Sequence, residues 1–416
     1  MEETVIEKNL LNEAKKISGE KSSDLKKAYE LYESGKYQEG VNYINQHSQI
    51  SSTSTGQVLL GCFYKKLNDS NSAISHWKKA TEISPLEHSA YANLAAHYYS
   101  VGNLNEAIYN WTIASTILPE NPNINLNLAL AYDQKGRRIK STKYFEKYLK
   151  YESNKQTHEY VMVKQRFANL MAKVDFYAKK VEEYRLQKDL QIIAALYLKM
   201  ISVYALLPSV YNNIGDIFSF DKNYEKAYEF YKIIYLHFPF TNKILIELAN
   251  LSFIMQQKSY AYVYYHRALK TLPEGTSHHA KVTNQLKSLA SVINDPECID
   301  FHLQKAQEAV DDNDYETAVD EYENYMILTE TENSENTEMQ QMIDKYKIFV
   351  NPEPFVINVL YNQIPELLNR KKLTACIEVC DRIISMAKDH SKEVVYAMKC
   401  KSDCKRIMIA REQFGV

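Results

Sequence analysis

Residues 54–87 read STGQVLLGCFYKKLNDSNSAISHWKKATEISPLE, and the 34 residues that follow, 88–121, read HSAYANLAAHYYSVGNLNEAIYNWTIASTILPEN. Aligned with each other, the two stretches match at several positions. The matched pairs are Leu60 and Leu94, Gly61 and Ala95, Tyr64 and Tyr98, Ala73 and Ala107, Trp77 and Trp111, Ala80 and Ala114, and Pro85 and Pro119. A third stretch, 122–155, keeps Leu128, Ala129, Tyr132, Gly136 and Phe145 in the same register. A fixed period of this length indicates stacked structural repeats.

Each repeat reads as two helices that cannot bury their apolar faces alone and so stack on their neighbours. Small residues such as Ala95 and Ala107 let the two helices approach, and aromatic residues such as Trp111 fill the space beside them. This pattern resembles the tetratricopeptide repeat. The resemblance implies an all-α, right-handed superhelical solenoid of helix-turn-helix units, and a role in binding other proteins.

A second matched pair of units follows further along the chain. Gly215, Phe218, Ala227, Tyr231 and Pro239 recur as Ala249, Ser252, Ala261, Tyr265 and Pro273. We therefore expect an N-terminal helix (1–20), a first repeat block (21–155), a long connecting helix (156–188), a second block (189–330), a linker (331–354), and a C-terminal hairpin with a capping helix (355–416). The linker is predicted because residues 329–338, TETENSENTE, are polar and have no apolar face.

The connecting helix has its own pattern. Its apolar residues alternate at spacings of three and four, as in a heptad seam. They are Tyr160, Val163, Phe167, Leu170, Val174, Tyr177, Val181 and Tyr184. We expect this seam to pack on adjacent repeat helices in a monomer, and the alternative is a coiled-coil dimer.

The composition of the chain limits the classes of binding partner that we expect. The 416 residues carry a formal net charge of −2, which favours neither nucleic acid nor a membrane surface. The N-terminus lacks the apolar run of a secretory signal, and the most apolar stretch, 192–207, is shorter than the ~20 residues that span a bilayer. A cytoplasmic protein without a membrane span is expected.

Charge is nonetheless uneven along the chain. Residues 295–344 hold sixteen acids and one base, whereas residues 133–190 hold fifteen bases and eight acids. Solvated helix surfaces explain such runs most simply. The alternatives are an acidic docking surface, or contact between the two segments within or between chains.

No phosphate-binding loop, nucleophile elbow or zinc-protease motif occurs, so neither an enzyme nor a cofactor is predicted. Two Cys-x3-Cys pairs, Cys376 with Cys380 and Cys400 with Cys404, lie either side of a turn near His390. This arrangement resembles the twin Cys-x3-Cys hairpin of small mitochondrial import chaperones, over the last hairpin only. Paired disulfides and a four-thiolate zinc site are open alternatives. Small buried reduced thiols, with no metal, are the interpretation that we favour.

The family's register places the sixth residue of each unit on the first helix, facing the concave groove. In this sequence it is Asn93, Asn127 and Asn213, while Leu59 and Glu247 interrupt the series. The series resembles the asparagine ladder in the repeat arm of protein O-glycosyltransferases. An amide can bond the backbone of an extended peptide, and we expect these side chains not to pack between helices. Neighbouring groove positions are Tyr99, Leu126, Leu130, Asp133, Asn212, Asp216, Phe220, Asn250 and Phe253.

The sequence therefore predicts a scaffold or adaptor that binds an extended peptide of a protein partner. One alternative is a regulatory or substrate-selecting arm of a multi-subunit enzyme, for example a glycosyltransferase system. Another is a self-assembling structural protein.

Overall fold

Helices make up the fold over the residues that the computed structural model describes, which are 23–330, 338–387 and 391–414. The expected N-terminal helix (1–20) and residues 331–337 of the polar segment lie outside this range. The first helices are α2 (Ser23–Glu33), α3 (Tyr37–Gln46), α4 (Ser48–Ser51), α5 (Ser54–Lys66), α6 (Ser70–Ile83), α7 (His88–Ser100), α8 (Leu104–Ile117), α9 (Pro122–Gln134), α10 (Arg138–Tyr151) and α11 (His158–Gln187). They are followed by α12 (Leu190–Val203), α13 (Pro208–Phe220), α14 (Tyr224–His237), α15 (Asn242–Ile254), α16 (Lys258–Leu269), α17 (Ser277–Ser288), the short 3₁₀ helix η2 (Ala290–Val292), α18 (Pro296–Asp311), α19 (Tyr315–Leu328), α20 (Glu338–Val350), α21 (Glu353–Asn369), α22 (Leu373–Met386) and α23 (Lys392–Phe414).

The chain divides into two compact units that differ from the expected domains. Unit 1 comprises residues 1–131 and 351–416, and unit 2 comprises residues 132–350. The C-terminal hairpin thus belongs with the first repeats, where Arg382 on α22 donates a hydrogen bond to the carbonyl oxygen of Ile117 on α8. Helix α10, which we expected in the first block, belongs with the helices that follow it.

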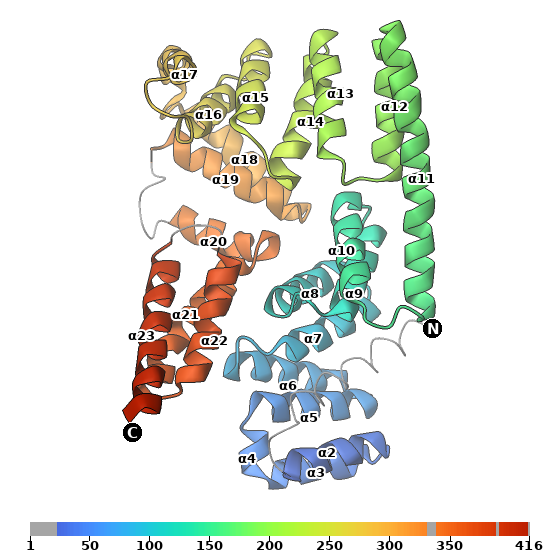
Figure 1. Ribbon diagram of the computed structural model, residues 1–416, viewed down its shortest axis with the longest axis vertical. Coiled ribbons are helices and arrows are strands. Elements are labelled where there is room, and N and C mark those ends of the chain that lie inside the picture. Colours follow the sequence, from blue (N-terminus) through green and yellow to red (C-terminus); the bar gives the residue numbers. More distant parts are fainter. Residues whose placement is uncertain (1–22, 331–337, 388–390, 415–416) are drawn as a thin grey trace. The chain divides into compact units, whose positions relative to one another are not determined.

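Antiparallel hairpins are the building block of both units (Figure 1). The main pairs are α5 with α6, α7 with α8, α13 with α14, α15 with α16, α18 with α19, and α22 with α23. This arrangement confirms the predicted all-α fold of stacked helix-turn-helix repeats. No described helix combines the length and the apolar character needed to cross a bilayer.

The turn inside each hairpin has a fixed backbone conformation. Residues with positive φ recur at a spacing of 34, at Asn68 and Gly102 and again at Lys188, Lys222 and Gln256. This left-handed conformation ends one helix and reverses the chain. The side chain of the next residue then caps the following helix at Asp69, Asn103, Asp189 and Asn223.

Small residues allow the two helices of a hairpin to touch, as the sequence predicted. A Cβ atom at Gly61 would lie 2.3 Å from Nε1 of Trp77, and one at Gly215 would lie 2.9 Å from the ring of Tyr231. The Trp77 indole also donates to the carbonyl oxygen of Val58 at 3.2 Å. The glycines are therefore required by close packing rather than by backbone conformation.

The predicted long helix is α11, of 30 residues. Its seam packs within the chain, since Val174 and Val181 are buried against α12 and α13. The ring of Phe167 lies 6.1 Å from the rings of Phe145 and Tyr204. These contacts are the ones expected of a helix that packs on its neighbours, and the monomer stays a prediction.

The expected linker, 331–354, is in part a packed helix. Helix α20 occupies residues 338–350 and buries Ile343 and Tyr346 against α18 and α19. Their spacing of three residues places both side chains on one face of a helix, so the apolar signal was present in the sequence. The polar run before it led us to extend the linker too far.

Candidate functional site

Except for Asp133 on α9, the predicted site residues of unit 2 lie on α13 and α15, the first helices of two successive hairpins. Asp216 accepts hydrogen bonds from Tyr231 Oη at 2.5 Å and from Asn212 Nδ2 at 2.8 Å. It also forms an ion pair with Lys243 at 3.4 Å. One repeat later, Asn250 Oδ1 accepts from Tyr265 Oη at 2.6 Å. The tyrosines of the second helices thus hold Asp216 and Asn250 in equivalent positions.

The three asparagines differ in their surroundings. Asn93 is only 5 % exposed, and its amide nitrogen lies 3.6 Å from Sγ of Cys62 on the preceding hairpin. The expectation that this side chain would not pack between helices is therefore wrong. Asn127 and Asn213 are half-buried, and Asn213 donates to Tyr197 Oη at 3.2 Å. These two amides keep part of their surface open to a ligand.

The other predicted residues form no single site. Tyr99 packs its ring 5.5 Å from that of Trp111, and Leu126 is buried, whereas Leu130 is exposed. Asp133 is exposed and forms an ion pair with Arg166 at 3.7 Å. Tyr99 and Leu126 therefore help to hold the repeats together as well as being groove candidates.

Exposed apolar residues mark one edge of unit 2. Phe220 is 75 % exposed and Phe253 is exposed as well. Leu186 is 89 % exposed and Ile254 is 48 % exposed, and both are in register with Phe220, because the three positions are spaced by 34 residues. They occupy the last turns of α11, α13 and α15, whose C-terminal ends lie at the same edge in Figure 1. We call Leu186, Phe220 and Ile254 the apolar row.

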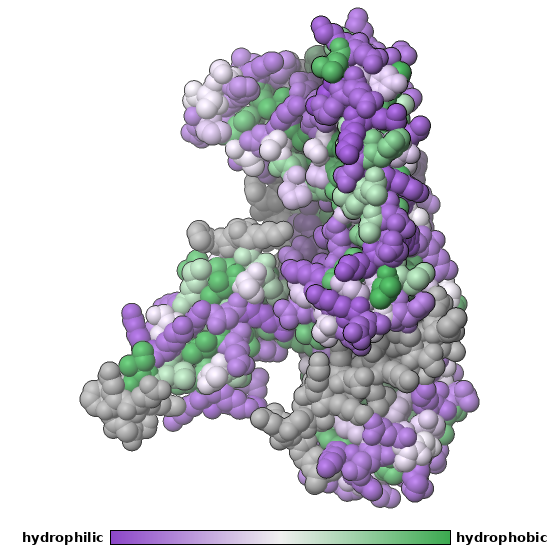
Figure 2. All heavy atoms as spheres, turned by 45° about the vertical axis from the view of Figure 1, so that its right-hand side comes forward, coloured by the Kyte–Doolittle hydropathy of each residue, from purple (hydrophilic) through white to green (hydrophobic). Residues whose placement is uncertain are grey.

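The sequence analysis missed Leu186 and Ile254, although the 34-residue spacing from Phe220 would have found them. The surrounding surface is largely hydrophilic. Figure 2 shows apolar side chains as separate patches among hydrophilic ones, on the side of the molecule to which α11 belongs. Single exposed apolar residues are common in soluble proteins, whereas a periodic row is not explained by chance exposure.

Two acids of the acidic segment are buried and paired, whereas others such as Asp311 and Asp312 are exposed. Asp320 on α19 is 4 % exposed and accepts from Lys232 Nζ at 2.5 Å, Arg267 Nη1 at 2.6 Å and Tyr235 Oη at 2.8 Å. Glu321 is also buried and lies 2.6 Å from Nδ1 of His302. The interpretation favoured from the sequence, that these acids lie on solvated helix surfaces, is therefore wrong for Asp320 and Glu321.

Contact between the acidic and basic segments occurs within the chain. Arg137 forms an ion pair with Asp314 at 3.6 Å, and Lys140 forms one with Glu316 at 2.9 Å. Burial would raise the pKa of Glu316, but a hydrogen bond from His237 and the charge of Lys140 lower it to about 2. Glu316 is thus ionised at neutral pH.

The four cysteines meet between α22 and α23 in unit 1. All four are buried and unbridged. Burial raises the pKa of Cys380 to about 11 and that of Cys404 to about 12, so both thiols are protonated at neutral pH. Within the described part of the chain, no group of three or more His, Cys, Asp or Glu side chains is arranged to hold a metal ion. His390 lies outside the described residues.

Comparison with known proteins supports the repeat assignment. A family model described as tetratricopeptide repeat matches residues 55–85, 122–155 and 208–232. No curated protein matches the chain in sequence at a significant level.

Solved structures with a similar helical arrangement share little sequence with the chain. The tetratricopeptide domain of P58(IPK) is 12% identical, with a TM-score of 0.37 over 86% of this chain and 98% of that one. The TPR2AB domain of yeast Sti1, in complex with pHSP90, is 17% identical, with a TM-score of 0.25 over 57% of this chain and 98% of that one. The Naa15/Naa10 structure bound to HypK-THB is 12% identical, with a TM-score of 0.29 over 91% of this chain and 66% of that one. Because these TM-scores are low, the assignment to tetratricopeptide repeats depends on the helical hairpins and on the segments matched by the family model.

Proposed function

Because this chain is a tetratricopeptide repeat protein, we propose that it binds an extended segment of another protein along the edge of unit 2 that carries the apolar row. Repeats of this kind serve in general as protein-interaction scaffolds. The observation that supports this particular edge is the 34-residue spacing of Leu186, Phe220 and Ile254, each exposed at the end of the first helix of a hairpin.

Apolar side chains at this edge would supply most of the affinity. Full burial of a Leu, Ile or Phe side chain contributes about 1.5–3 kcal/mol, and these three residues have much of their surface still to bury. The row is flanked by polar groups already fixed in position, namely Asp216 with its ion-pair partner Lys243, and Asn250. Fixed polar groups orient a ligand at little entropic cost.

The amide of Asn213 is a candidate for bonding the ligand backbone, because it is half-buried and keeps part of its surface open. Asn213 is on α13, the helix that also carries Phe220. One such hydrogen bond is worth a net ~1 kcal/mol, so Asn213→Ala should weaken binding about fivefold. Asn93 is left out of this test because its substitution would disturb packing between hairpins.

The test is affinity purification from the source cell with a triple variant, Leu186→Asp, Phe220→Asp and Ile254→Asp. We expect the partner to be retained by the wild-type chain and lost from the variant, with unchanged helical content by circular dichroism. A matched control is Val395→Asp, which places the same charge at an exposed apolar position of α23 in unit 1.

Equal recovery of the partner by wild type and triple variant would refute the proposed edge. The nature of the recovered protein also separates the alternatives. A catalytic subunit would indicate a regulatory or substrate-selecting arm, and recovery of this chain alone would indicate self-assembly.

A further inference from the structure

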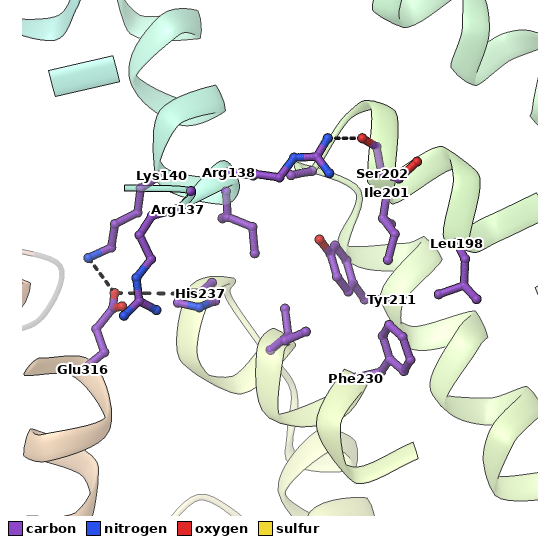
Figure 3. A pocket seen from close by; sticks show the side chains of 14 residues that line it. Arg137, Arg138, Lys140, Leu198, Ile201, Ser202, Tyr211, Phe230, His237 and Glu316 are labelled. Atoms are coloured by element: carbon purple, nitrogen blue, oxygen red, sulfur yellow. Dashed lines mark hydrogen bonds and ion pairs between the residues drawn. The ribbon is translucent and has the colours of Figure 1, made fainter. Parts of the chain in front are cut away.

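A cavity separate from the apolar row lies at the N-terminal end of α10 in unit 2. The cavity there has a volume of about 420 Å³, which is within the usual range of ligand pockets. Figure 3 shows Arg137, Arg138 and Lys140 on one side, and apolar side chains from α12, α13 and α14 on the other. One group of a ligand could therefore contact the apolar walls while a second, anionic group contacts the arginine and lysine side chains.

The walls are mostly hydrocarbon. They include Leu198 and Ile201 from α12, Tyr211 from α13, and Phe230 and Ile233 from α14. Leu198 is exposed, and Ile201, Phe230 and Ile233 are only half-buried. An apolar side chain entering this cavity would remove that surface from water, which is favourable.

The rim carries an excess of positive charge. Lys140 and Arg137 have carboxylate partners, Glu316 at 2.9 Å and Asp314 at 3.6 Å. Arg138 donates to the carbonyl oxygen of Ser202, and among the described residues it has no carboxylate partner. The positive charge of Arg137 and Lys140 also affects the neighbouring Lys135. Burial, together with the charges of Arg137 and Lys140, lowers the pKa of Lys135.

The positive charge continues along α10 beyond the cavity. Lys143, Lys147 and Lys150 follow Lys140 at spacings of three, four and three, which places all four on one face of the helix. From residue 137 to residue 150 there are six bases and one acid, Glu146. This lysine face is about 15 Å long at 1.5 Å per residue, the length of some four or five residues of extended chain. A ligand that matches it is a polymer rather than a small molecule.

We propose that this cavity holds one bulky apolar side chain of an acidic peptide segment, whose carboxylates lie against Arg138 and the lysine face of α10. Arg138 can bind a carboxylate through two parallel N–H groups. Nucleic acid is the competing ligand, and the aliphatic and aromatic walls of the cavity favour an apolar side chain over it. The site is independent of the apolar row, which lies at the hairpin turns of α11, α13 and α15.

The test begins with selection of peptides from a phage-displayed library of random dodecapeptides on the full-length protein, with counter-selection on Leu198→Trp, which fills the cavity. We expect enriched sequences rich in Asp and Glu that share one Phe, Leu, Ile or Trp. An enriched peptide, blocked at both ends, is then titrated by calorimetry. Replacing its apolar residue by Ala should weaken binding roughly 10- to 100-fold. Raising salt from 50 to 300 mM should weaken binding further.

Protein variants locate the site. Arg138→Glu and Leu198→Trp should each weaken the peptide at least tenfold, whereas Lys287→Glu, an exposed cation on α17, should change affinity less than twofold. Phe220→Asp should leave this peptide unaffected, so failure of this proposal and failure of the proposed edge are distinguishable. Selection without enrichment of acids, equal binding by Leu198→Trp, or tighter binding of a twelve-nucleotide oligouridine than of the peptide would overturn the proposal.

Discussion

Asp320 is the residue whose substitution best tests the packing of unit 2. Its carboxylate, on α19, is buried among Lys232 of α14, Arg267 of α16 and Tyr235 of α14. Asp320→Asn keeps the size of the side chain but removes its charge. Two buried cations then lose their counter-ion, which is the costly way to break a buried ion pair.

The magnitude follows from these contacts. Hydrogen bonds to a charged group are worth ~1.5–3 kcal/mol each, so the three bonds that this carboxylate accepts give at most ~9 kcal/mol. The loss should be smaller, because Arg267 keeps Glu323 at 3.5 Å and the side chains of Lys232 and Arg267 retain some access to water. We expect the variant to lose about 3–5 kcal/mol of free energy of opening for α19.

Hydrogen exchange read by mass spectrometry is the assay. Peptides from residues 315–328 should lose protection by a factor between roughly 10² and roughly 4 × 10³ in Asp320→Asn, a range set by ~1.4 kcal/mol per tenfold change. Asp311→Asn is the matched control, because Asp311 is exposed on α18 and its carboxylate accepts a hydrogen bond from Gln307 of the same helix at 3.0 Å. The control should change opening by less than ~0.5 kcal/mol. Equal protection in the two variants would refute the reasoning.

The pH dependence gives a second check on Asp320. Burial would raise its pKa, but the charges of Lys232 and Arg267 outweigh burial and hold the pKa well below its usual range. A carboxyl whose pKa is lower in the folded state contributes stability above its unfolded pKa of about 3.9, and this contribution is lost as pH falls below that value. The difference between wild type and Asp320→Asn should therefore be constant from pH 7 to about pH 5 and shrink below about pH 4.

Further predictions concern the turns, the hairpin contacts, the long helix and the thiols. Lys222→Gly should raise the free energy of unfolding by about 0.5–1 kcal/mol, because a non-glycine residue is strained at the φ of 57° that Lys222 adopts. Gly102→Ala should lower the free energy of unfolding by a similar amount, because Gly102 also has a positive φ. Urea titrations check both. Gly61→Ala should cost about 1–3 kcal/mol and lower the melting temperature, since the new Cβ would meet an indole ring at 2.3 Å, and an unchanged melt would contradict the packing argument. The chain should sediment as a monomer, and a dimer dissociated by Phe167→Glu would show that the heptad seam also pairs chains. Elemental analysis should find no zinc; about one equivalent per chain, lost in Cys380→Ser, would show a metal site instead.

The repeat period alone was enough to predict the fold. Stacked hairpins depend on local signals, namely small residues where helices touch, aromatic residues beside them and a turn every 34 residues, and all of these can be read along the chain. Gly61 opposite Trp77, and Gly215 opposite Tyr231, are contacts within single hairpins, each sixteen residues apart in sequence. Nearest-neighbour packing of this kind leaves little for distant parts of the chain to decide.

Only the tertiary structure shows which polar side chains are exposed to solvent and which are buried. Nothing in the sequence around Asp320 shows that Lys232 and Arg267, 88 and 53 residues away, remove it from water. The same holds for Asn93, whose burial depends on Cys62 of the neighbouring hairpin, and for the cavity at α10, whose walls come from four other helices. Periodicity predicts which face of a helix is apolar. The partner of a charged side chain, however, depends on the curvature of the stack of helices, because the curvature brings distant repeats into contact. That curvature is set by the sum of many contacts between helices.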